Sequence, residues 1–219
     1  MSSKEVQVDV TALAVVGRQG DEEYARLQRE IEALRLENAG LQTLADTDPL
    51  TGLANRRGLA GSWQHEQARA QRYGYPCSVL AIDLDQFKQI NDRCGHLTGD
   101  RVLGAVARLL LASVRAEDLV ARVGGDEFLV LLPQADHLTA QTIAERVQTA
   151  LGQLDAPADP GGWTLSIGIA CSPPTPRHSL FTAADRALYR AKERGRNQIA
   201  SWDSGAIDPH LAHHRQANR

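Results

Sequence analysis

The sequence predicts an α/β (α+β) sandwich in which helices flank a mixed central β-sheet, preceded by an N-terminal coiled-coil helix. Three observations support this prediction. Short, almost entirely apolar runs alternate with longer segments whose apolar residues recur every three or four positions, as strands alternating with helices do. Two of these runs are joined by a short turn containing glycines, which is typical of a hairpin. A polar segment with a heptad pattern precedes the first of them.

The composition is that of an ordinary globular chain. Its 219 residues include 24 Lys and Arg against 27 Asp and Glu, a formal charge of −3, so bulk electrostatics favour no nucleic-acid partner. Hydrophobic residues make up 42% of the chain, which is sufficient for one substantial core and an extension.

Neither the apolar stretches nor the cysteines indicate a membrane or secreted protein. The most apolar N-terminal stretch, residues 11–17, is far shorter than the roughly 20 residues of a membrane-spanning helix. Cys77, Cys94 and Cys171 are scattered and form no C-x-x-C pair, which argues against a disulfide framework or a zinc site. We therefore expect no membrane insertion and a location in the reducing cytoplasm.

Residues 21–46 carry the heptad pattern of a coiled-coil dimerisation stalk. Asn38 falls within the apolar seam, where it fixes the register and favours two strands. An amphipathic helix packed on its own domain is the alternative. Residues 1–20 predict no structure or role. The residues at the a and d positions are Tyr24, Leu27, Ile31, Leu34, Asn38, Leu41 and Ala45.

A separate domain, residues 47–202, begins where proline and glycine interrupt this helix. Pro49 disfavours a helical conformation in the residue before it, and Gly52 permits a turn. Asn55 can then cap a helix that runs to about Gly74. A new structural unit therefore starts just after the stalk.

Strands and helices alternate through the rest of this domain. The predicted strands are residues 78–82, 119–123, 128–132 and 163–170, with residues 197–202 able to close the sheet. The apolar faces of the remaining helices are marked by Leu103, Val106, Leu110 and Val114, by Ile143, Val147, Ala150 and Leu151, and by Leu180, Ala184, Leu188 and Ala191. We expect residues 203–219, which are polar and show no periodicity, to be a flexible C-terminal tail; metal binding by His210, His213 and His214 is the less favoured interpretation.

The topology predicts that acidic residues meet at one edge of the sheet. A helical crossover normally places the strand that ends at Asp83 parallel and adjacent to residues 119–123, so both strands finish at the same edge. Asp83 then faces Asp126 and Glu127 in the turn between the next two strands. Such carboxylates repel one another unless a cation compensates, and all-oxygen ligands favour Mg²⁺.

Polar residues near this edge suit a nucleotide. Gly124 and Gly125 leave the turn without side chains, which allows a nucleotide to approach the backbone, although a tight turn alone explains them. Residues 84–93 begin a short helix whose exposed N–H groups suit phosphate. Lys192 and Arg196 can balance a triphosphate, yet each taken singly is more often a solvated surface charge.

Three further side chains after the strand end offer base-reading chemistry. Asn91, His96 and Asp100 supply amide, imidazole and carboxylate groups. A carboxylate with an amide can pair with the edge of guanine that carries N1–H, N2–H₂ and O6. His96 by default caps or packs a helix.

At this point the residues resemble a known family, the GGDEF diguanylate cyclases, in order and spacing over roughly residues 46–202. Several motifs in register, each with a role in one site, are more specific than any single one. The matching segments are residues 48–57 (DPLTGLANRR), residues 82–88 (IDLDQFK), Asn91-Asp92, Gly95-His96, Gly99-Asp100, residues 124–128 (GGDEF), Ala191-Lys192 and Gly195-Arg196-Asn197.

The resemblance implies a nucleotidyl-cyclase or polymerase-palm-like fold that condenses two GTP into cyclic di-GMP and releases two pyrophosphates. It implies Mg²⁺, with Mn²⁺ as a possible substitute, and Asp126 or Glu127 as the group that takes the hydroxyl proton. The implied metal ligands are Asp83, the Leu84 carbonyl, Asp126 and Glu127. The implied substrate-binding residues are Phe87, Lys88, Asn91, His96, Asp100, Lys192 and Arg196, with Asn91 and Asp100 reading guanine.

The resemblance also implies a homodimer and product inhibition. Each family site binds one GTP, so two domains must meet face to face, which gives the stalk a use as a dimerisation element and as a place for an unknown upstream regulator. Arg115 and Asp118 fit the R-x-x-D inhibitory site of the family, and Arg146 stands where a further product-binding arginine often lies. An ordinary surface pair of Arg115 and Asp118 is the alternative.

Two other functions are consistent with these residues. A non-catalytic cyclic di-GMP receptor would keep Arg115 and Asp118 but has no need of Asp83, Asp126 or Lys192. A synthase of hybrid dinucleotides would accept ATP beside GTP, whereas Asp100 favours guanine, because adenine lacks the N1–H and N2–H₂ donors.

Overall fold

The computed structural model describes residues 26–37, 40, 42, 44–153, 162–172 and 180–202. It divides into two compact units, Met1–Ala45 and Asp46–Arg219. The segment 1–20, the tail 203–219 and the seam residues Tyr24, Asn38 and Leu41 lie outside the described residues.

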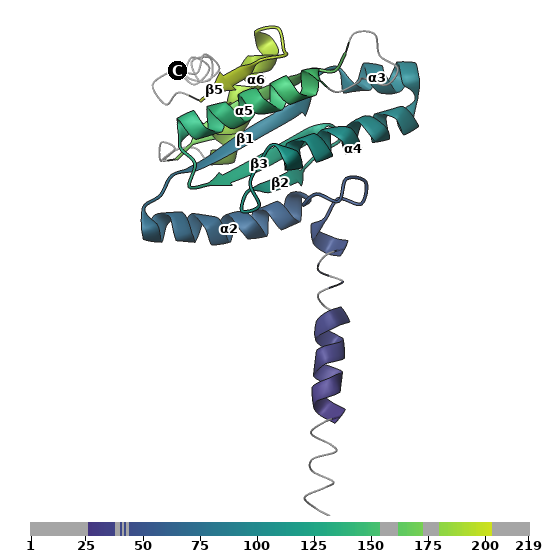
Figure 1. Ribbon diagram of the computed structural model, residues 1–219, viewed down its shortest axis with the longest axis vertical. Helices are drawn as coiled ribbons and strands as arrows, with labels where there is room; N and C mark the ends of the chain where they lie inside the picture. Colours follow the sequence, from purple (N-terminus) through teal and green to yellow (C-terminus); the bar gives the residue numbers. More distant parts are fainter. Residues whose placement is uncertain are drawn as a thin grey trace, which may run out of the picture. The chain divides into compact units, whose positions relative to one another are not determined.

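A five-stranded mixed sheet forms the centre of the second unit (Figure 1). Its order is β2-β3-β1-β4-β5, with the last pair parallel and the other pairs antiparallel. The predicted mixed sheet is therefore confirmed. The strands are β1 (Cys77–Leu84), β2 (Leu119–Arg122), β3 (Glu127–Pro133), β4 (Leu165–Cys171) and β5 (Ile199–Ser201).

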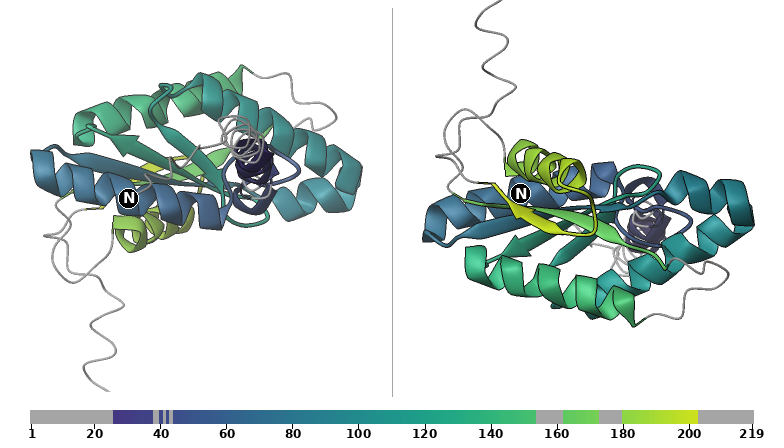
Figure 2. Two further views of the ribbon diagram at one scale, coloured as in Figure 1. Left: turned by 90° about the horizontal axis from the view of Figure 1, so that it is seen from below. Right: turned by 90° about the horizontal axis from the view of Figure 1, so that it is seen from above.

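Helices cover both faces of this sheet, and Figure 2 shows α5 and α6 on opposite sides of it. One core cluster joins the sheet to α4 and α5, and the other joins it to α2 and α6. The flanked sheet agrees with the predicted sandwich. The helices are α2 (Arg56–Tyr73), α3 (Phe87–Cys94), α4 (His96–Ala112), α5 (His137–Gly152) and α6 (Leu180–Glu193).

Strand β1 is buried along its whole length because both of its faces are covered. Leu80 and Ile82 point into the cluster with α4 and α5, whereas Val79 and Ala81 point into the cluster with α2 and α6. Side chains alternate along a strand, so Asp83 lies on the face covered by α2 and α6.

The prediction that β1 lies next to the strand of residues 119–123 was wrong. Strands β1 and β2 run parallel, since each is antiparallel to β3, but β3 lies between them. The hairpin folds back so that β3 pairs with β2 on one side and with β1 on the other. The predicted common edge survives this correction, because the end of β1 and the turn between β2 and β3 still meet.

Helix α2 begins and ends as predicted. The Asn55 side chain accepts hydrogen bonds from the backbone N–H groups of Arg57 and Gly58, and Gly74 closes the helix in the left-handed conformation at φ 73°.

Gly168 of β4 allows α6 to pack closely against the sheet, because a Cβ at this position would collide with the backbone of Ala184 and Leu188. This contact fixes the position of α6.

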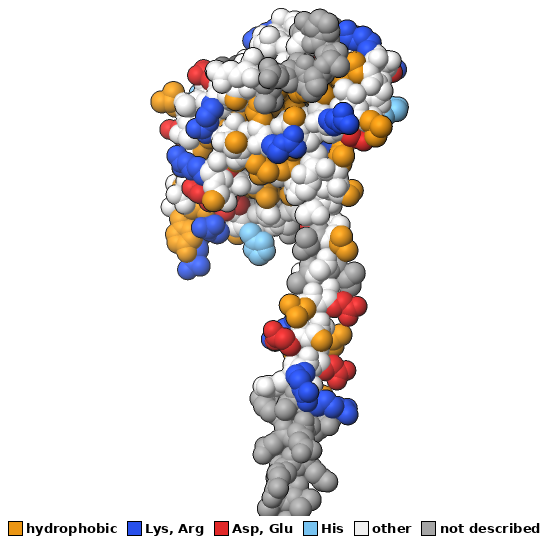
Figure 3. Space-filling view, turned by 45° about the vertical axis from the view of Figure 1, so that its right-hand side comes forward, with side chains coloured by type: hydrophobic (Ala, Val, Ile, Leu, Met, Phe, Trp, Pro, Cys, Tyr) orange, Lys and Arg blue, Asp and Glu red, His pale blue; other side chains and the backbone are white. Residues whose placement is uncertain are grey.

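Residues 26–37 of the first unit form a helix with exposed apolar side chains. Leu27, Ile31 and Leu34 are 45%, 47% and 58% exposed, and Figure 3 shows hydrophobic side chains among acidic and basic ones on this helix. The coiled coil itself stays a prediction. No helix among the described residues has the length and apolar content needed to cross a bilayer.

Candidate functional site

The candidate site lies where β1 ends against the turn between β2 and β3. Asp83 pairs with Glu127 in the antiparallel register of β1 and β3. One residue further, the Leu84 backbone N–H donates to the Asp126 carbonyl oxygen over 3.2 Å. The sheet therefore holds residues 124–127 directly beside the end of β1.

The Asp83 carboxyl is buried, with 7% of the residue exposed. Burial raises its pKa, and so do the neighbouring carboxylates of Asp126 and Asp85. The ammonium group of Lys192 lies 2.7 Å from Asp83 Oδ2, and it lowers the pKa without cancelling the rise. Asp83, Asp85 and Asp126 thus place three carboxylates near this lysine, an arrangement that suits the binding of a cation.

The donor set at this edge suits a hard cation. Asp83 and Asp126 offer carboxylate oxygens, and Leu84 offers its carbonyl. Among the residues that the structure describes, no group of three or more His, Cys, Asp or Glu side chains is gathered to hold a metal by itself. Mg²⁺ is usually held by one or two carboxylates together with substrate phosphates and water, so these residues fit a metal that arrives with a phosphorylated substrate.

Glu127 borders a second feature, a pocket of about 400 Å³ between α2, β3 and α6. Its wall includes Trp63 and Phe181, whose rings meet edge to face at 5.2 Å. Asp185 also borders this pocket, where desolvation and the charge of Glu127 raise its pKa. The structure thus brings Asp126 close to Asp83, while Glu127 also faces this separate pocket.

The conformation of the turn depends on its glycines and on Arg122. A Cβ at Gly124 would lie 2.6 Å from Glu127 Oε2, whereas a Cβ at Gly125 would meet nothing within 4 Å. The Arg122 guanidinium donates to the Gly125 carbonyl oxygen over 3.1 and 2.7 Å. Arg122 therefore holds the turn through the Gly125 carbonyl, and the space beside Gly125 is open, so a ligand can approach the backbone there.

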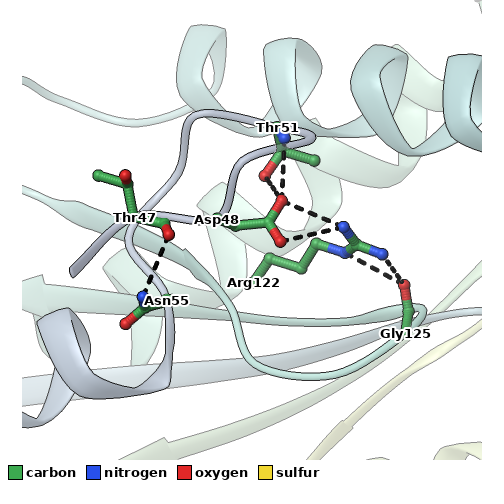
Figure 4. A network of polar contacts seen from close by, with 6 residues as sticks. All are labelled: Thr47, Asp48, Thr51, Asn55, Arg122 and Gly125. Carbon is green, nitrogen blue, oxygen red and sulfur yellow. Dashed lines mark hydrogen bonds and ion pairs between the residues drawn. The ribbon is translucent and has the colours of Figure 1, made fainter. Parts of the chain in front are cut away.

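Arg122 also connects this turn to the first turn of the domain (Figure 4). Its Nη1 lies 3.1 Å from each carboxylate oxygen of Asp48. Asp48 Oδ1 accepts further hydrogen bonds from the Thr51 backbone N–H at 2.9 Å and the Thr51 hydroxyl at 2.6 Å. The sequence argument missed Arg122, and it included Asp48 in the helix interruption and in the matching segment 48–57 without giving it a role.

The predicted base-reading residues lie on α3 and α4. Gly99 of α4 allows the Asn91 amide and the Phe87 ring of α3 to pack directly against it, because a Cβ there would overlap the Asn91 side chain. Gly95 separates the two helices at φ 80°. Asn91 is partly buried, whereas Lys88, His96 and Asp100 are exposed. Asn91 is thereby fixed next to the turn of α4 that carries Asp100.

The predicted phosphate-binding residues flank the C-terminal end of α6. Lys192, in the last turn, contacts Asp83. Arg196 lies in the following loop, where its backbone N–H donates to the Ala191 carbonyl oxygen over 3.1 Å. A third residue, Asp85, accepts a hydrogen bond from the Asn197 backbone N–H over 3.0 Å. The sequence argument included Asp85 in a motif but gave it no role.

The R-x-x-D residues form a separate cluster beside α5. The Asp118 carboxylate accepts from the Arg115 backbone N–H over 2.8 Å, and the Asp118 backbone N–H donates to the Arg115 carbonyl oxygen over 3.1 Å. Burial raises the pKa of Asp118 although Arg115 and Arg146 lower it. Arg146 donates to the Ser113 carbonyl oxygen and lines a pocket of about 430 Å³.

Comparison with known proteins identifies the family to which this chain belongs. Residues 45–198 match the family model described as "Diguanylate cyclase, GGDEF domain", so the chain belongs to the GGDEF diguanylate cyclase family. Diguanylate cyclase DosC of Escherichia coli (strain K12) is 43% identical over 159 residues, which are 71% of this chain and 35% of DosC. Diguanylate cyclase DgcP of Pseudomonas aeruginosa is 40% identical over 156 residues, 70% of this chain and 23% of DgcP.

These curated relatives are longer, and the chain spans about a third of DosC and about a quarter of DgcP. Among solved structures, the coiled coil and GGDEF domain of DgcB from Caulobacter crescentus, in complex with c-di-GMP, has a TM-score of 0.73 at 30% identity, covering 83% of this chain and 98% of that one. Diguanylate cyclase SiaD of Pseudomonas aeruginosa, in complex with its activator SiaC, has a TM-score of 0.67 at 34% identity, covering 87% and 77%.

We predict that the contacts of Asp48 make stability depend on pH. Burial raises the pKa of this carboxyl, but hydrogen bonds from Thr51 and Arg122 outweigh it, so the folded pKa lies below the ordinary value of 3.8. A lowered folded pKa contributes stability above the unfolded pKa and loses it as pH falls through the folded pKa. Chemical denaturation between about pH 6 and pH 3 should therefore show a larger loss for the wild type than for Asp48→Asn. Parallel pH profiles would contradict this assignment.

Proposed function

We propose that this chain is a diguanylate cyclase, which condenses two GTP into cyclic di-GMP and releases two pyrophosphates. The observation that supports the proposal most is the meeting of Asp83, Asp126 and Lys192 at the end of β1, beside the open turn at Gly125. Acidic and basic groups side by side suit a metal-bound triphosphate. The proposal assigns the chain to the cytoplasm, where its GTP substrate is present.

In this proposal the guanine base binds at α3 and α4. Asn91 and Asp100 read the base edge, because an amide and a carboxylate together match its N1–H, N2–H₂ and O6 groups. His96, Phe87 and Lys88 complete the substrate contacts. The packing of Asn91 against Gly99 supports this role, because it holds the amide in place before substrate arrives.

The triphosphate lies between the end of β1 and the end of α6. Lys192 and Arg196 hold the terminal phosphates. Asp83, Asp126, Glu127 and the Leu84 carbonyl hold Mg²⁺, with Mn²⁺ as a substitute. When bound, the metal neutralises negative charge on the phosphates. The remaining contribution of the chain is to align the reacting groups.

The reaction joins the 3′ oxygen of one GTP to the α-phosphorus of the other as the bond to pyrophosphate breaks. Asp126 accepts the hydroxyl proton, directly or through water, with Glu127 as the alternative acceptor. The same step then occurs in the opposite sense to close the ring. Each domain supplies one GTP, so the enzyme works as a face-to-face homodimer.

The stalk brings the two domains together in this proposal. Leu27, Ile31 and Leu34 follow each other at spacings of four and three residues and are all exposed, which is an apolar stripe without cover in a single described chain. The solved structure of DgcB includes a coiled coil with its GGDEF domain, and SiaD is in complex with an activator. These relatives support a dimerising stalk that a partner protein can regulate.

Product inhibition is the second regulatory element that we propose. Arg115, Asp118 and Arg146 bind cyclic di-GMP, whose guanine edges and phosphates suit arginine forks and a carboxylate acceptor. The pocket of about 430 Å³ beside Arg146 supports this assignment. The same cluster also favours the alternative function, a non-catalytic cyclic di-GMP receptor.

We predict that Asp126→Asn abolishes synthesis of cyclic di-GMP, lowering the rate by at least about 1000-fold, because it removes both a metal ligand and the proton acceptor. The measurement is incubation with GTP and Mg²⁺, with and without ATP, followed by chromatography and mass spectrometry. Glu145→Gln, an amide substitution on the exposed face of α5, is the matched control and should retain activity.

Each product pattern has a definite meaning. Wild-type turnover that is absent from Asp126→Asn supports the cyclase. Equal turnover in both proteins contradicts the role of Asp126. A mixed dinucleotide made with ATP indicates the hybrid synthase, and binding of cyclic di-GMP without turnover indicates the receptor.

We predict that Leu27→Asp combined with Leu34→Asp converts the chain to monomers and lowers its specific activity at low protein concentration, because charges in a coiled-coil seam oppose pairing. Leu36→Asp is the matched control: Leu36 is 68% exposed but lies outside the seam. Sedimentation velocity and initial rates over a range of concentrations measure both effects. A dimer unaffected by the double substitution would refute the stalk assignment.

We predict that Arg115→Ala raises the concentration of cyclic di-GMP needed for half-inhibition by at least about tenfold, because it removes a charged, forked donor. Progress curves with added product provide the measurement. Glu117→Ala, in the same turn but outside the R-x-x-D pattern, should keep wild-type inhibition. Identical inhibition of Arg115→Ala and the wild type would contradict the inhibitory role and leave Arg115 and Asp118 as an ordinary surface pair.

A further inference from the structure

We propose that Asp85 is a positioning residue that sets the direction of Arg196 toward the terminal phosphates of GTP. The inference rests on the proposed function, because it assigns Arg196 to the triphosphate. It follows from the hydrogen bonds of a buried carboxylate and from the unusual backbone of the loop after α6. Asp85 acts through Arg196 and touches no reacting atom.

Asp85 is buried, with 5% of the residue exposed, and hydrogen-bond donors surround its carboxylate. The Ser166 hydroxyl donates to Oδ1 over 2.7 Å. The Thr164 hydroxyl donates to Oδ2 over 2.7 Å, and the Asn197 backbone N–H donates to the same oxygen over 3.0 Å. The Asp85 side chain is thus hydrogen-bonded to Ser166 in β4, to Thr164 just before β4, and to the loop after α6.

That loop has a backbone that needs external support. Gly195, Arg196 and Asn197 have φ values of 112°, 65° and 48° in succession. Left-handed conformations are unfavourable for residues other than glycine, and they persist where the surroundings enforce them. The bond from Asn197 to Asp85 is one such constraint.

Two further bonds hold Arg196 itself. Its backbone N–H donates to the Ala191 carbonyl oxygen over 3.1 Å, and its carbonyl oxygen accepts from the Gln198 side-chain amide over 3.2 Å. The left-handed path then fixes the direction in which the Arg196 side chain leaves the loop. Because Lys192 is already held by Asp83, Asp85 keeps the second cation at a set place relative to the first.

Asp83 and Asp85, at the end of β1, therefore have different roles. The Asp83 carboxylate pairs with Lys192 and lies beside the carboxylate of Asp126, an arrangement that suits the binding of a further cation. The Asp85 carboxylate is instead occupied by two hydroxyls and a backbone N–H. These partners assign the metal to Asp83 and the support of the loop to Asp85.

A double-mutant cycle between Asp85 and Arg196 tests this inference. The measured quantities are KM for GTP, kcat, and the dissociation constant of 3′-deoxy-GTP, a substrate analogue without the attacking hydroxyl. We expect Asp85→Ala to raise KM and this dissociation constant by about tenfold with a smaller change in kcat. Asp85→Asn, which keeps one acceptor oxygen, should show a smaller effect. In the Arg196→Ala background neither substitution should weaken binding further.

Ser78→Ala is the matched control for lost stability. Ser78 is fully buried in β1, the strand that Asp85 directly follows. Its hydroxyl donates to the Ala135 carbonyl oxygen over 2.7 Å at the end of β1 remote from the site. It should lower the melting temperature without changing KM. If the effects of Asp85→Ala and Arg196→Ala multiply independently, or if Ser78→Ala raises KM equally, Asp85 is only structural and the inference is overturned. A wild-type chain that neither binds nor converts GTP would instead refute the proposed function.

Discussion

The crowding of carboxylates at the end of β1 is the constraint on which the site depends. Asp83, Asp85 and Asp126 lie close enough for the last two to raise the pKa of the buried first. Such a group is stable only where positive charge or hydrogen-bond donors compensate. Lys192 supplies the charge to Asp83, while Ser166, Thr164 and Asn197 supply donors to Asp85.

Close packing of helices and strands positions these compensating groups. Gly168 allows α6 to lie directly on β4, which places the last turn of that helix over the end of β1. On the other side of Asp83, antiparallel pairing with β3 and the Leu84 hydrogen bond bring Asp126 into place. Arg122 then ties this turn to Asp48 at the start of the domain. Further hydrogen bonds, from Arg56 to the Val123 carbonyl oxygen and from the Arg122 backbone N–H to the Ala54 carbonyl oxygen, join the start of the domain to the same hairpin.

Local patterns predicted the elements well, because they depend on neighbouring residues. The cap at Asn55, the apolar strand that leads to Asp83 and the hairpin around Gly124 all follow from such signals. The pairing of β1 with β3 was not predicted, because a helical crossover fixes the relative direction of two strands but not whether a third strand lies between them. The roles of Arg122 and Asp85 arise from contacts across 74 and up to 112 residues, which no local pattern contains.

Cation binding measures most directly whether this strand end is a metal and nucleotide site. The experiment is Mn²⁺ binding followed by electron paramagnetic resonance, with and without 3′-deoxy-GTP, for the wild type and Asp83→Asn. The account predicts that the nucleotide strengthens Mn²⁺ binding by the wild type and that Asp83→Asn weakens the joint binding by at least about tenfold. Equal Mn²⁺ affinity in both proteins, with no effect of the nucleotide, would contradict it.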